Sequence, residues 1–428
     1  MLSHEENELL CRVEGDAPMG QLIRRYWIPA CLSAELPEPN GIPKRVQLVG
    51  LRLVVWRDQN GEVGVMQEEC PHRGASLALA RGDGDGLVCI YHGWKIGIDG
   101  TVLETPCEPA RSRVRYATKH VSYPTREAGG VVWVYLGPAK HEPRLPEYPW
   151  MRLPGDRVRV TRSVCRANFM QSIEGGIDSA HSDFLHSTQT STTTTAERDT
   201  VGADGTRVRP SNDKAPTIEV QNTTFGFYYA GIRTAARDPE NLRYVRITAF
   251  VAPFHCFIPP NYVQMCVPTN DYETAFYLLW YNADRSLTDD EIRSQEAFLG
   301  LRPGVDLDEN GVRFGKSANG WLQDRGAMAR GDSYTGVVGT TAQDCAVQES
   351  MGAIQDRTKE HLGASDIAVI RMRRLMLAAA RAVQAGEDCG FNGAAVSEQD
   401  IECAAGILGR DEDWRSMLTS MLGKTTAR

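Results

Sequence analysis

Apolar and polar residues alternate through much of residues 44–138, which is the period of a half-buried β-strand. Glycine, asparagine and aspartate interrupt the alternation at short intervals, as they do at turns between strands. The strand-like stretches are 45–58, 61–69, 87–100 and 129–137. This pattern predicts a small all-β module in the first third of the chain.

A proline-rich segment separates this module from the rest of the chain. Residues 137–156 carry five prolines, a composition that marks a domain boundary. Further strand-like stretches follow at 217–236, 242–260 and 273–283, and two helical blocks lie near 167–186 and 342–384. We therefore expect an antiparallel sheet backed by helices, so that the fold class is α+β.

Size and charge narrow the possible functions. A chain of 428 residues exceeds what one core usually supports, so two domains are expected. The polar start lacks the pattern of a secretory signal, and arginines interrupt the longest apolar stretch (366–386), so a cytoplasmic location without a membrane span is expected. A net charge of -8 disfavours nucleic acid as a partner. Eleven cysteines in such a chain indicate metal ligation or inert core thiols.

Two short loops of the β-module each combine a cysteine with a histidine. The loops CPHRG and CIYHGW supply Cys70, His72, Cys89 and His92. These four side chains suit either a structural zinc ion or a 2Fe-2S cluster. Zinc sites usually group their ligands by type. In a Rieske cluster one iron takes both cysteines and the other takes both histidines. Loops that each give one sulfur and one nitrogen therefore favour the cluster.

A second group of candidate ligands lies in ANFMQSIEGGIDSAHSDFLHST, which contains Glu174, Asp178, His181 and His186. Asp178 and His181 are three residues apart, so on a helix they share a face. His186 would lie about 140° further round than His181, so both rings reach one metal only if the helix bulges or ends between them. Two unrelated helical histidines are the alternative. Two histidines and a carboxylate form the facial triad of non-haem iron.

The carboxylate of such a triad has to come from another segment. The helix predicted at 340–363 offers Asp344, Glu349, Asp356 and Glu360. At about 100° per residue, Asp344 lies on the side of the apolar stripe, and the other three fall among charged neighbours. The stripe is Val347, Met351, Ile354 and Leu362. Asp344 is therefore predicted to face inward, where a metal would stabilise it. The alternative is a first-turn aspartate that stabilises the start of the helix.

Both groups of ligands resemble the motifs of Rieske ring-hydroxylating oxygenases. CPHRG with CIYHGWKIGIDG is similar to their cluster motif, and EGGIDSAHSDFLHS is similar to their iron motif. The stretches WLQDRGAMARGDSYTG and QDCAVQESMGAIQDRTKEHLGASDIAVIRMRR resemble the phthalate dioxygenase branch. The likeness covers roughly residues 5–385. It implies a Rieske domain (44–140) and a catalytic domain of helix-grip type (141–428), against which an N-terminal helical segment (1–43) packs.

The resemblance also implies the cofactors and the partners. A Rieske 2Fe-2S cluster would be held by the two cysteines and two histidines of the β-module. Mononuclear non-haem Fe(II) would be held by His181, His186 and Asp344. At Glu174 the sequence departs from more distant members, some of which have asparagine there, so Glu174 is given only a supporting catalytic role. Asp178 would bridge His181 to His92 of a neighbouring subunit in a homotrimer, and two trimers can stack as a hexamer. A separate flavin and iron-sulfur reductase would pass on electrons from NADH.

The implied reaction is the cis-dihydroxylation of an aromatic carboxylate, with phthalate, isophthalate or a meta-substituted benzoate as the substrate class. A buried carboxylate favours a bidentate arginine. Alternation along residues 242–250 places Arg246 on one face and Arg243 on the other, so Arg246 is the first candidate. Arg207 and Arg209 are further candidates, and an exposed ion-pairing arginine is the alternative for each.

Two other functions fit parts of the pattern. A monooxygenase that performs O-demethylation or hydroxylation of an aromatic acid would use the same metal ligands. A Rieske electron carrier without oxygenase activity would need only the first group. The length of the chain and the histidines of the second group disfavour the carrier.

Overall fold

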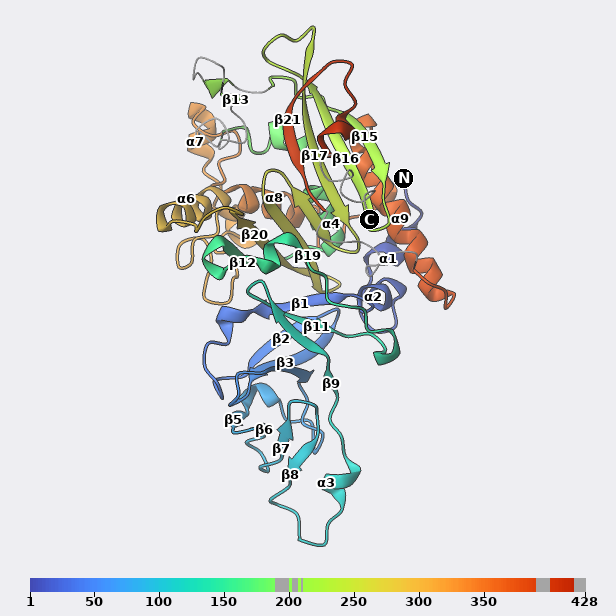
Figure 1. The fold of residues 1–428 in the computed structure, drawn as a ribbon, viewed down its shortest axis with the longest axis vertical. Helices are drawn as coiled ribbons and strands as arrows, with labels where there is room; N and C mark the ends of the chain where they lie inside the picture. Colours follow the sequence, from blue (N-terminus) through green and yellow to red (C-terminus); the bar gives the residue numbers. More distant parts are fainter. Residues whose placement is uncertain (189–199, 202–206, 209–210, 390–400, 419–428) are drawn as a thin grey trace.

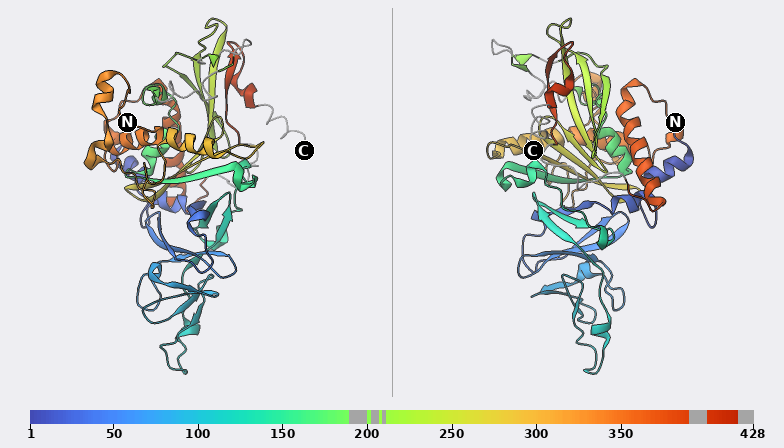
Figure 2. Two further views of the ribbon diagram at one scale, coloured as in Figure 1. Left: turned by 90° about the vertical axis from the view of Figure 1, so that its left-hand side faces the viewer. Right: turned by 45° about the vertical axis from the view of Figure 1, so that its right-hand side comes forward.

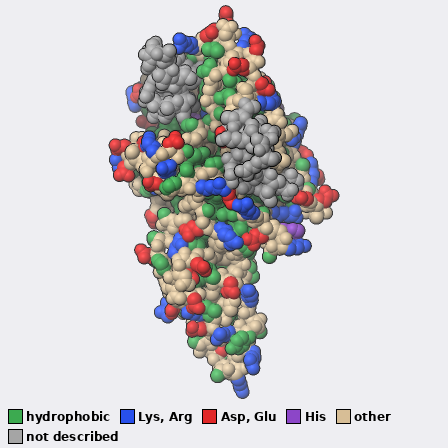
Figure 3. Space-filling view, in the orientation of Figure 1, with side chains coloured by type: hydrophobic (Ala, Val, Ile, Leu, Met, Phe, Trp, Pro, Cys, Tyr) green, Lys and Arg blue, Asp and Glu red, His purple; other side chains and the backbone are tan. Residues whose placement is uncertain are grey.

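The computed structural model describes residues 1–188, 200–201, 207–208, 211–389 and 401–418. Figures 1 and 2 show an elongated molecule in which a narrow all-β lobe, built from the first eleven strands, projects from a broader lobe of sheet and helices. The α+β architecture predicted from the sequence is confirmed. Figure 3 shows acidic and basic side chains intermixed over the face that it presents.

The narrow lobe contains three small antiparallel sheets. One sheet has the order β1 (Trp27–Leu32), β11 (Val131–Tyr135), β10 (Thr125–Ala128). The next has the order β2 (Lys44–Leu48), β3 (Leu51–Arg57), β4 (Val63–Gln67), β9 (Ser122–Tyr123). The sheet furthest from the broad lobe has the order β5 (Arg81–Asp83), β6 (Gly86–Val88), β7 (Lys95–Gly97), β8 (Val102–Glu104). The short helix α3 (Val114–Ala117) lies beside β8.

Residues 45–58 form a hairpin instead of one continuous strand. The turn between β2 and β3 consists of Val49 and Gly50, and both have a positive φ, of 51° and 78°. A β-branched residue rarely adopts this conformation. At this turn the broad lobe holds the backbone, because Val49 N–H donates to Pro268 O at 2.9 Å and Gly50 N–H donates to Thr269 O at 2.8 Å. The hairpin tip therefore joins the two lobes.

The broad lobe is organised around one antiparallel sheet of eight strands. The strands along the sheet are β12 (Val158–Cys165), β20 (Glu273–Tyr281), β19 (Tyr262–Asn270), β18 (His255–Ile258), β17 (Leu242–Val251), β16 (Gly226–Thr234) and β15 (Thr217–Asn222). One edge of β17 is shared: residues 249–251 pair with β18, and residues 242–247 pair with β21 (Ala404–Gly409). A small separate ladder joins β13 (Thr200–Val201) and β14 (Arg207–Val208).

Helices cover the sheet, and they are shorter than the sequence predicted. The main helices that the structure describes in this lobe are α4 (Phe169–Gly176), α6 (Asp289–Leu299), α7 (Arg325–Arg330), α8 (Thr340–Ser350) and α9 (Ile367–Gln384). The block predicted at 342–384 is two helices, because the chain leaves the helical conformation after Ser350 and returns to it at Ile367. The block predicted at 167–186 is also broken, since α4 ends at Gly176. Within the described residues no helix has the length and apolarity to cross a bilayer.

The N-terminal segment contributes to both lobes. Helices α1 (His4–Cys11) and α2 (Pro18–Ile23) pack against α9, as Figure 1 also shows. Strand β1 pairs instead with β11 of the narrow lobe. The largest hydrophobic core is continuous across the junction and includes Trp133 of β11 and Met265 of β19. The predicted domain boundaries at 43 and 140 stay predictions.

Candidate functional site

The two Cys/His loops of the narrow lobe adopt the same backbone turn. Cys70 O accepts from Gly74 N–H at 2.8 Å, and Cys89 O accepts from Gly93 N–H at 2.9 Å. Both glycines have a positive φ, of 75° and 73°, which a residue with a Cβ rarely adopts. Histidine occupies the third position of one turn and the fourth position of the other. Each turn therefore carries one sulfur and one imidazole, and the two turns face each other.

The donor groups of these loops fit a metal cluster. Both cysteines belong to a small separate core with Trp94, and the His72 and His92 rings lie edge to face with centroids 4.5 Å apart. Burial raises the pKa of the Cys70 thiol to about 11, although backbone N–H groups of the same loop oppose this shift. Nδ1 of His72 is buried and has no hydrogen-bond partner in the described part of the chain. A metal would supply the missing partner and favour the thiolate.

The edge of this site near His92 is the more open one. Tyr91 packs against the His92 ring with centroids 3.8 Å apart, and the Arg73 guanidinium lies 5.5 Å from the Tyr91 ring. Tyr91 and Ile90 are 56% and 64% exposed. On the opposite side, the buried Trp94 ring stacks on His72 at 4.7 Å. His92 is therefore the ligand candidate that lies closest to the surface.

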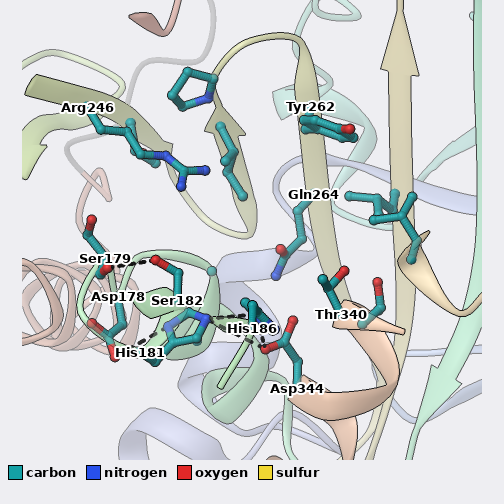
Figure 4. A pocket seen from close by; sticks show the side chains of 18 of the residues that line it. Asp178, Ser179, His181, Ser182, His186, Arg246, Tyr262, Gln264, Thr340 and Asp344 are labelled. Carbon is teal, nitrogen blue, oxygen red and sulfur yellow. Dashed lines mark hydrogen bonds and ion pairs between the residues drawn. The ribbon is translucent and has the colours of Figure 1, made fainter. Parts of the chain in front are cut away.

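A second site lies in the broad lobe, in a cavity of about 380 Å³. It is enclosed by the sheet, by the segment that follows α4, by the start of α8 and by β21. Its walls include aromatic and aliphatic side chains from several strands, namely Tyr229, Tyr244, Ile258, Pro259, Phe276 and Leu278. Figure 4 shows polar side chains that point into this space from opposite sides.

Three of the residues that line the cavity are arranged as metal ligands. Nε2 of His186 lies 3.2 Å from Nε2 of His181 and 3.2 Å from Oδ1 of Asp344, and His181 Nε2 lies 3.6 Å from the same oxygen. The three ligand atoms all lie within 4.8 Å of one another. Two imidazoles and one carboxylate with an open side toward a cavity are the donor set of non-haem iron.

The local backbone explains how His181 and His186 meet. Helix α4 ends at Gly176, and the chain makes a 3-10 turn over His181–Asp183 and then further turns up to His186. Asp178 lies between these elements, outside any helix, and its Oδ1 accepts from Ala180 N–H at 2.7 Å. The predicted break between the histidines was wrong in its place, because the helix already ends before Asp178. Asp178 and His181 therefore do not share the face of a helix as predicted, although they lie beside each other.

Asp344 faces the cavity, as predicted, although not for the predicted reason. Helix α8 ends before residue 354, and Val347 and Met351 of the supposed apolar stripe are 38% and 45% exposed. The buried face of α8 is formed instead by Thr341, Gln343, Cys345 and Gln348. Glu360, predicted to be solvated, is largely buried in an ion pair with Arg373.

The electrostatics of the three groups suit a divalent cation. Burial raises the pKa of Asp344, but His186 and His181 lower it by more, so the net shift is downward. Burial lowers the pKa of His181, but Asp178 and Asp344 outweigh it, so the net shift is upward. An ionised carboxylate buried beside two imidazoles needs a positive partner, and a metal ion is one.

Each imidazole has a further contact through its second ring nitrogen. His181 Nδ1 lies 3.4 Å from Oδ2 of Asp178, a distance that makes this an ion-pair contact more than a well-formed hydrogen bond. His186 Nδ1 lies 2.7 Å from Oε1 of Gln343. The sequence indicated Asp178 but not Gln343. A glutamine is not a usual metal ligand, so no spacing relative to the ligands distinguishes it in the sequence.

The remaining candidates are placed differently. Arg246 lies on β17 and its side chain lines the cavity together with Tyr244 and Thr248, as alternation predicted. Arg207 belongs to β14, and Arg209 lies outside the described residues. Glu174 does not line the cavity, because its carboxylate binds Arg357 and Arg373. A supporting catalytic role for Glu174 stays a prediction.

An all-β lobe with paired Cys/His loops, joined to a sheet-and-helix lobe with two histidines and a carboxylate, defines a two-centre non-haem iron protein. Comparisons with known proteins identify the family. Residues 26–124 match the Rieske [2Fe-2S] domain, and residues 134–427 match the LigXa C-terminal domain like family. The chain therefore belongs to the Rieske non-haem iron oxygenases, as an oxygenase subunit with a 2Fe-2S cluster and a mononuclear iron.

Individual relatives agree with this assignment. The chain is 44% identical to the phthalate 4,5-dioxygenase oxygenase subunit of Pseudomonas putida, over 97% of this chain and 94% of the relative. It is 34% identical to the 3-chlorobenzoate-3,4-dioxygenase oxygenase subunit of Comamonas testosteroni, over 89% of each. Among solved structures, NdmA of Pseudomonas putida CBB5 has a similar fold, with a TM-score of 0.57 and 16% identity over 93% of this chain and 100% of that one. An oxygenase subunit takes electrons from a separate partner protein.

Proposed function

We propose that this protein is the terminal oxygenase component that cis-dihydroxylates an aromatic carboxylate of the phthalate, isophthalate or meta-substituted benzoate class. The observation that carries the proposal is the meeting of His181, His186 and Asp344 with Arg246 in one cavity. Relatives named for phthalate and for 3-chlorobenzoate support the substrate class, because both compounds are aromatic carboxylates.

The cavity has the two surfaces that such a substrate needs. Aromatic and aliphatic side chains such as Phe276 and Leu278 offer an apolar wall for a ring. The guanidinium of Arg246 points into the space from β17, opposite Asp344, and would bind the carboxylate (Figure 4). A volume of about 380 Å³ lies in the range of small-molecule sites. The ring would then lie between Arg246 and the His/His/Asp group.

The metal ligands follow from the same geometry. In this proposal Cys70, His72, Cys89 and His92 hold the cluster, and His181, His186 and Asp344 hold the mononuclear iron. When bound, the cluster supplies electrons and the mononuclear iron supplies the activation of dioxygen. The protein contributes the orientation of the ring, the exclusion of water by the apolar wall and the fixed direction of each imidazole.

We further propose the assembly implied by the sequence. Asp178 would join His181 to His92 of a neighbouring subunit in a homotrimer, with a hexamer as the stacked form. The exposed position of Tyr91 beside His92 supports this, since a protruding cluster edge is available to a partner. The electron donor would be a flavin and iron-sulfur reductase that oxidises NADH.

The test is a panel of aromatic acids and neutral ring analogues, assayed with reductase and NADH for coupled oxygen consumption. We expect uptake with a ring carboxylate and a cis-diol product in which both new oxygen atoms come from ¹⁸O-labelled dioxygen. One labelled atom in the aromatic product would show a hydroxylating monooxygenase instead. Release of formaldehyde from a methoxylated acid, with no labelled atom in the aromatic product, would show an O-demethylating monooxygenase, because the oxygen atom from dioxygen is placed on the methyl carbon and leaves with the formaldehyde. Absence of substrate-dependent oxygen uptake would leave only the electron carrier.

Replacement of the cavity arginine tests the carboxylate contact. Arg246→Met should raise the KM for the aromatic acid by about 30-fold or more, since truncating one partner of a buried charged pair costs about 2–5 kcal/mol. Arg243→Met is the matched control, because Arg243 lies on the opposite face of β17 and donates to Glu412 O. Steady-state kinetics with both variants decide the matter, and an unchanged KM for Arg246→Met would refute the contact.

A further inference from the structure

Gln343 has a side-chain amide whose oxygen and both N–H groups have hydrogen-bond partners. Its Oε1 lies 2.7 Å from Nδ1 of His186, and its Nε2 donates to Thr335 Oγ1 at 2.9 Å and to Val337 O at 2.8 Å. The residue is 2% exposed, so water does not compete for these contacts. It immediately precedes Asp344 on α8.

These contacts determine which ring nitrogen of His186 carries the proton. The carbonyl of Val337 can only accept a hydrogen bond, so the Nε2 group of Gln343 has to point toward it. The amide oxygen then faces His186 and requires a donor there. Nδ1 of His186 is therefore the N–H nitrogen, and Nε2 keeps its lone pair. That lone pair is directed at the position shared with His181 and Asp344.

The two imidazoles of the site are thus supported by unlike groups. His181 has the carboxylate of Asp178 beside its second nitrogen, whereas His186 has a neutral amide. The helix makes the second contact possible. Successive residues point about 100° apart on an α-helix, so Asp344 can face the cavity while Gln343 reaches the side of the His186 ring. One turn of α8 supplies one ligand candidate and supports another.

We propose that Gln343 is a positioning residue for the mononuclear iron, which fixes the tautomer and the ring direction of His186 and ties them to the 335–337 turn. This inference rests on the proposed role of His186 as an iron ligand. Partners of this kind on a ligating histidine orient the ring and strengthen metal binding.

The experiment measures ferrous iron affinity at the mononuclear site by anaerobic competition with a chromogenic chelator, with the Rieske absorbance as the check on folding. Gln343→Leu removes all three contacts at nearly constant volume and should weaken iron binding by about 10–100-fold. Gln323→Leu is the matched control, because Gln323 donates to Thr335 O of the same turn at 2.7 Å without contacting a ligand. It should bind iron as the wild type does.

A second variant separates positioning from simple support of the turn. Gln343→Glu keeps an acceptor for His186 Nδ1 but cannot donate to Thr335 or Val337. It should therefore recover most of the iron affinity that Gln343→Leu loses. Affinity as low as in the leucine variant would mean that only the turn matters, and would overturn the proposal. If Gln343→Leu does not fold, the glutamate variant compared with Gln323→Leu decides between the same two outcomes.

Failure of the inference and failure of the proposed site give different results. Wild-type affinity in Gln343→Leu overturns the inference alone. If the wild type holds no iron that His186→Ala removes, the ligand assignment fails, and the role of Gln343 fails with it.

Discussion

His255 is a buried imidazole that no proposed step uses. It is 3% exposed, and neither ring nitrogen has a hydrogen-bond partner among the described residues. Its ring packs among Trp133 of the narrow lobe, Tyr148 and Phe254, with centroids between 4.7 and 6.4 Å away. Burial lowers the pKa of His255 to about 3. The residue is therefore neutral in the folded protein at all ordinary pH values.

This burial predicts a loss of stability in acid. In the unfolded chain the pKa of a histidine is about 6.5, so as the pH falls from about 6.5 toward about 3 the unfolded state binds a proton that the folded state does not. His255 alone should cost about 1.4 kcal/mol of unfolding free energy at about pH 5.5 relative to about pH 7.5. Urea unfolding of wild type and His255→Phe at both pH values measures this. The variant should lose less stability in acid.

The control for this prediction is His141→Phe, which makes the same substitution at an exposed histidine. Phenylalanine needs no hydrogen bond, but its ring is larger than the imidazole and has to fit a filled site, so the comparison is made on the pH dependence of stability and not on the stability near neutrality. Equal acid sensitivity in wild type and His255→Phe would show that this imidazole is not the cause.

Single residues were predictable from sequence where their chemistry is distinctive. Cysteine and histidine at short spacing, and the pair His181 and His186, are recognisable in any fold that brings them together. Gln343 was not predictable, because its role depends on where the 335–337 turn lies in space. The face of Arg246 was predictable, since alternation along the strand brings Tyr244, Arg246 and Thr248 of β17 to the cavity.

At the scale of elements, a buried ion-pair cluster connects three segments. Glu174 on α4 binds Arg357 of the turn Arg357–Lys359 through both oxygens, at 2.8 and 2.9 Å, and Arg373 on α9 at 2.7 Å. Arg373 also pairs with Glu360. Arg357 is completely buried. Burial raises the pKa of Glu174, but the two arginines lower it by more, so the group is ionised.

Loss of this carboxylate should destabilise the fold. Glu174→Gln removes the carboxylate that binds the buried Arg357 and leaves Arg373 with Glu360 alone, and breaking a buried pair costs about 3–5 kcal/mol. The comparison is Asp290→Asn, which removes an exposed pair with Arg293 and should change stability by less than about 1 kcal/mol. Thermal unfolding followed by circular dichroism measures both. Equal melting temperatures for Glu174→Gln and the wild type would contradict the assigned role.

Helices and strands were predictable where they depend on the pattern of neighbouring residues. The predictions were wrong where an element depends on contacts with residues that are distant in sequence. The hairpin at Val49 was missed because its turn is held by β19, far away in sequence. The pattern predicts one long helix over 342–384, because the alternation of charged and apolar residues continues past the point where α8 ends. The sequence pattern does not distinguish strands β12, β19 and β21, although all three belong to the main sheet.

At the scale of the whole molecule, the two centres lie in different lobes. Figures 1 and 2 show the cluster loops, around β5 to β8, at a distance from α4 and α8. Asp178 lies beside His181 and lines the cavity. In the proposed trimer this carboxylate connects the centres of two subunits. Its replacement by an amide, which keeps one acceptor for His181, should therefore affect turnover without affecting metal binding.

Asp178→Asn tests this connection. The variant should keep its mononuclear iron and its Rieske absorbance but lose nearly all turnover, because an amide cannot hold two imidazole N–H groups as a carboxylate does. Iron analysis, visible spectroscopy and coupled oxygen uptake are the measurements. Asp356→Asn, at an exposed carboxylate, is the control and should be fully active. Wild-type turnover in Asp178→Asn would refute the bridge.

Strand β21 has a consequence for synthesis on the ribosome. Its Ala405 pairs with Arg246, and together with Gly406 it forms part of the cavity wall, although β17 is made about 160 residues earlier. A nascent chain can therefore place every proposed iron ligand outside the exit tunnel while one side of the substrate chamber is still missing. An mRNA truncated after the codons for α9 would yield a protein that is able to bind metal. In that protein residues 242–247 of β17 would lack their partner strand, and the cavity would be open to water.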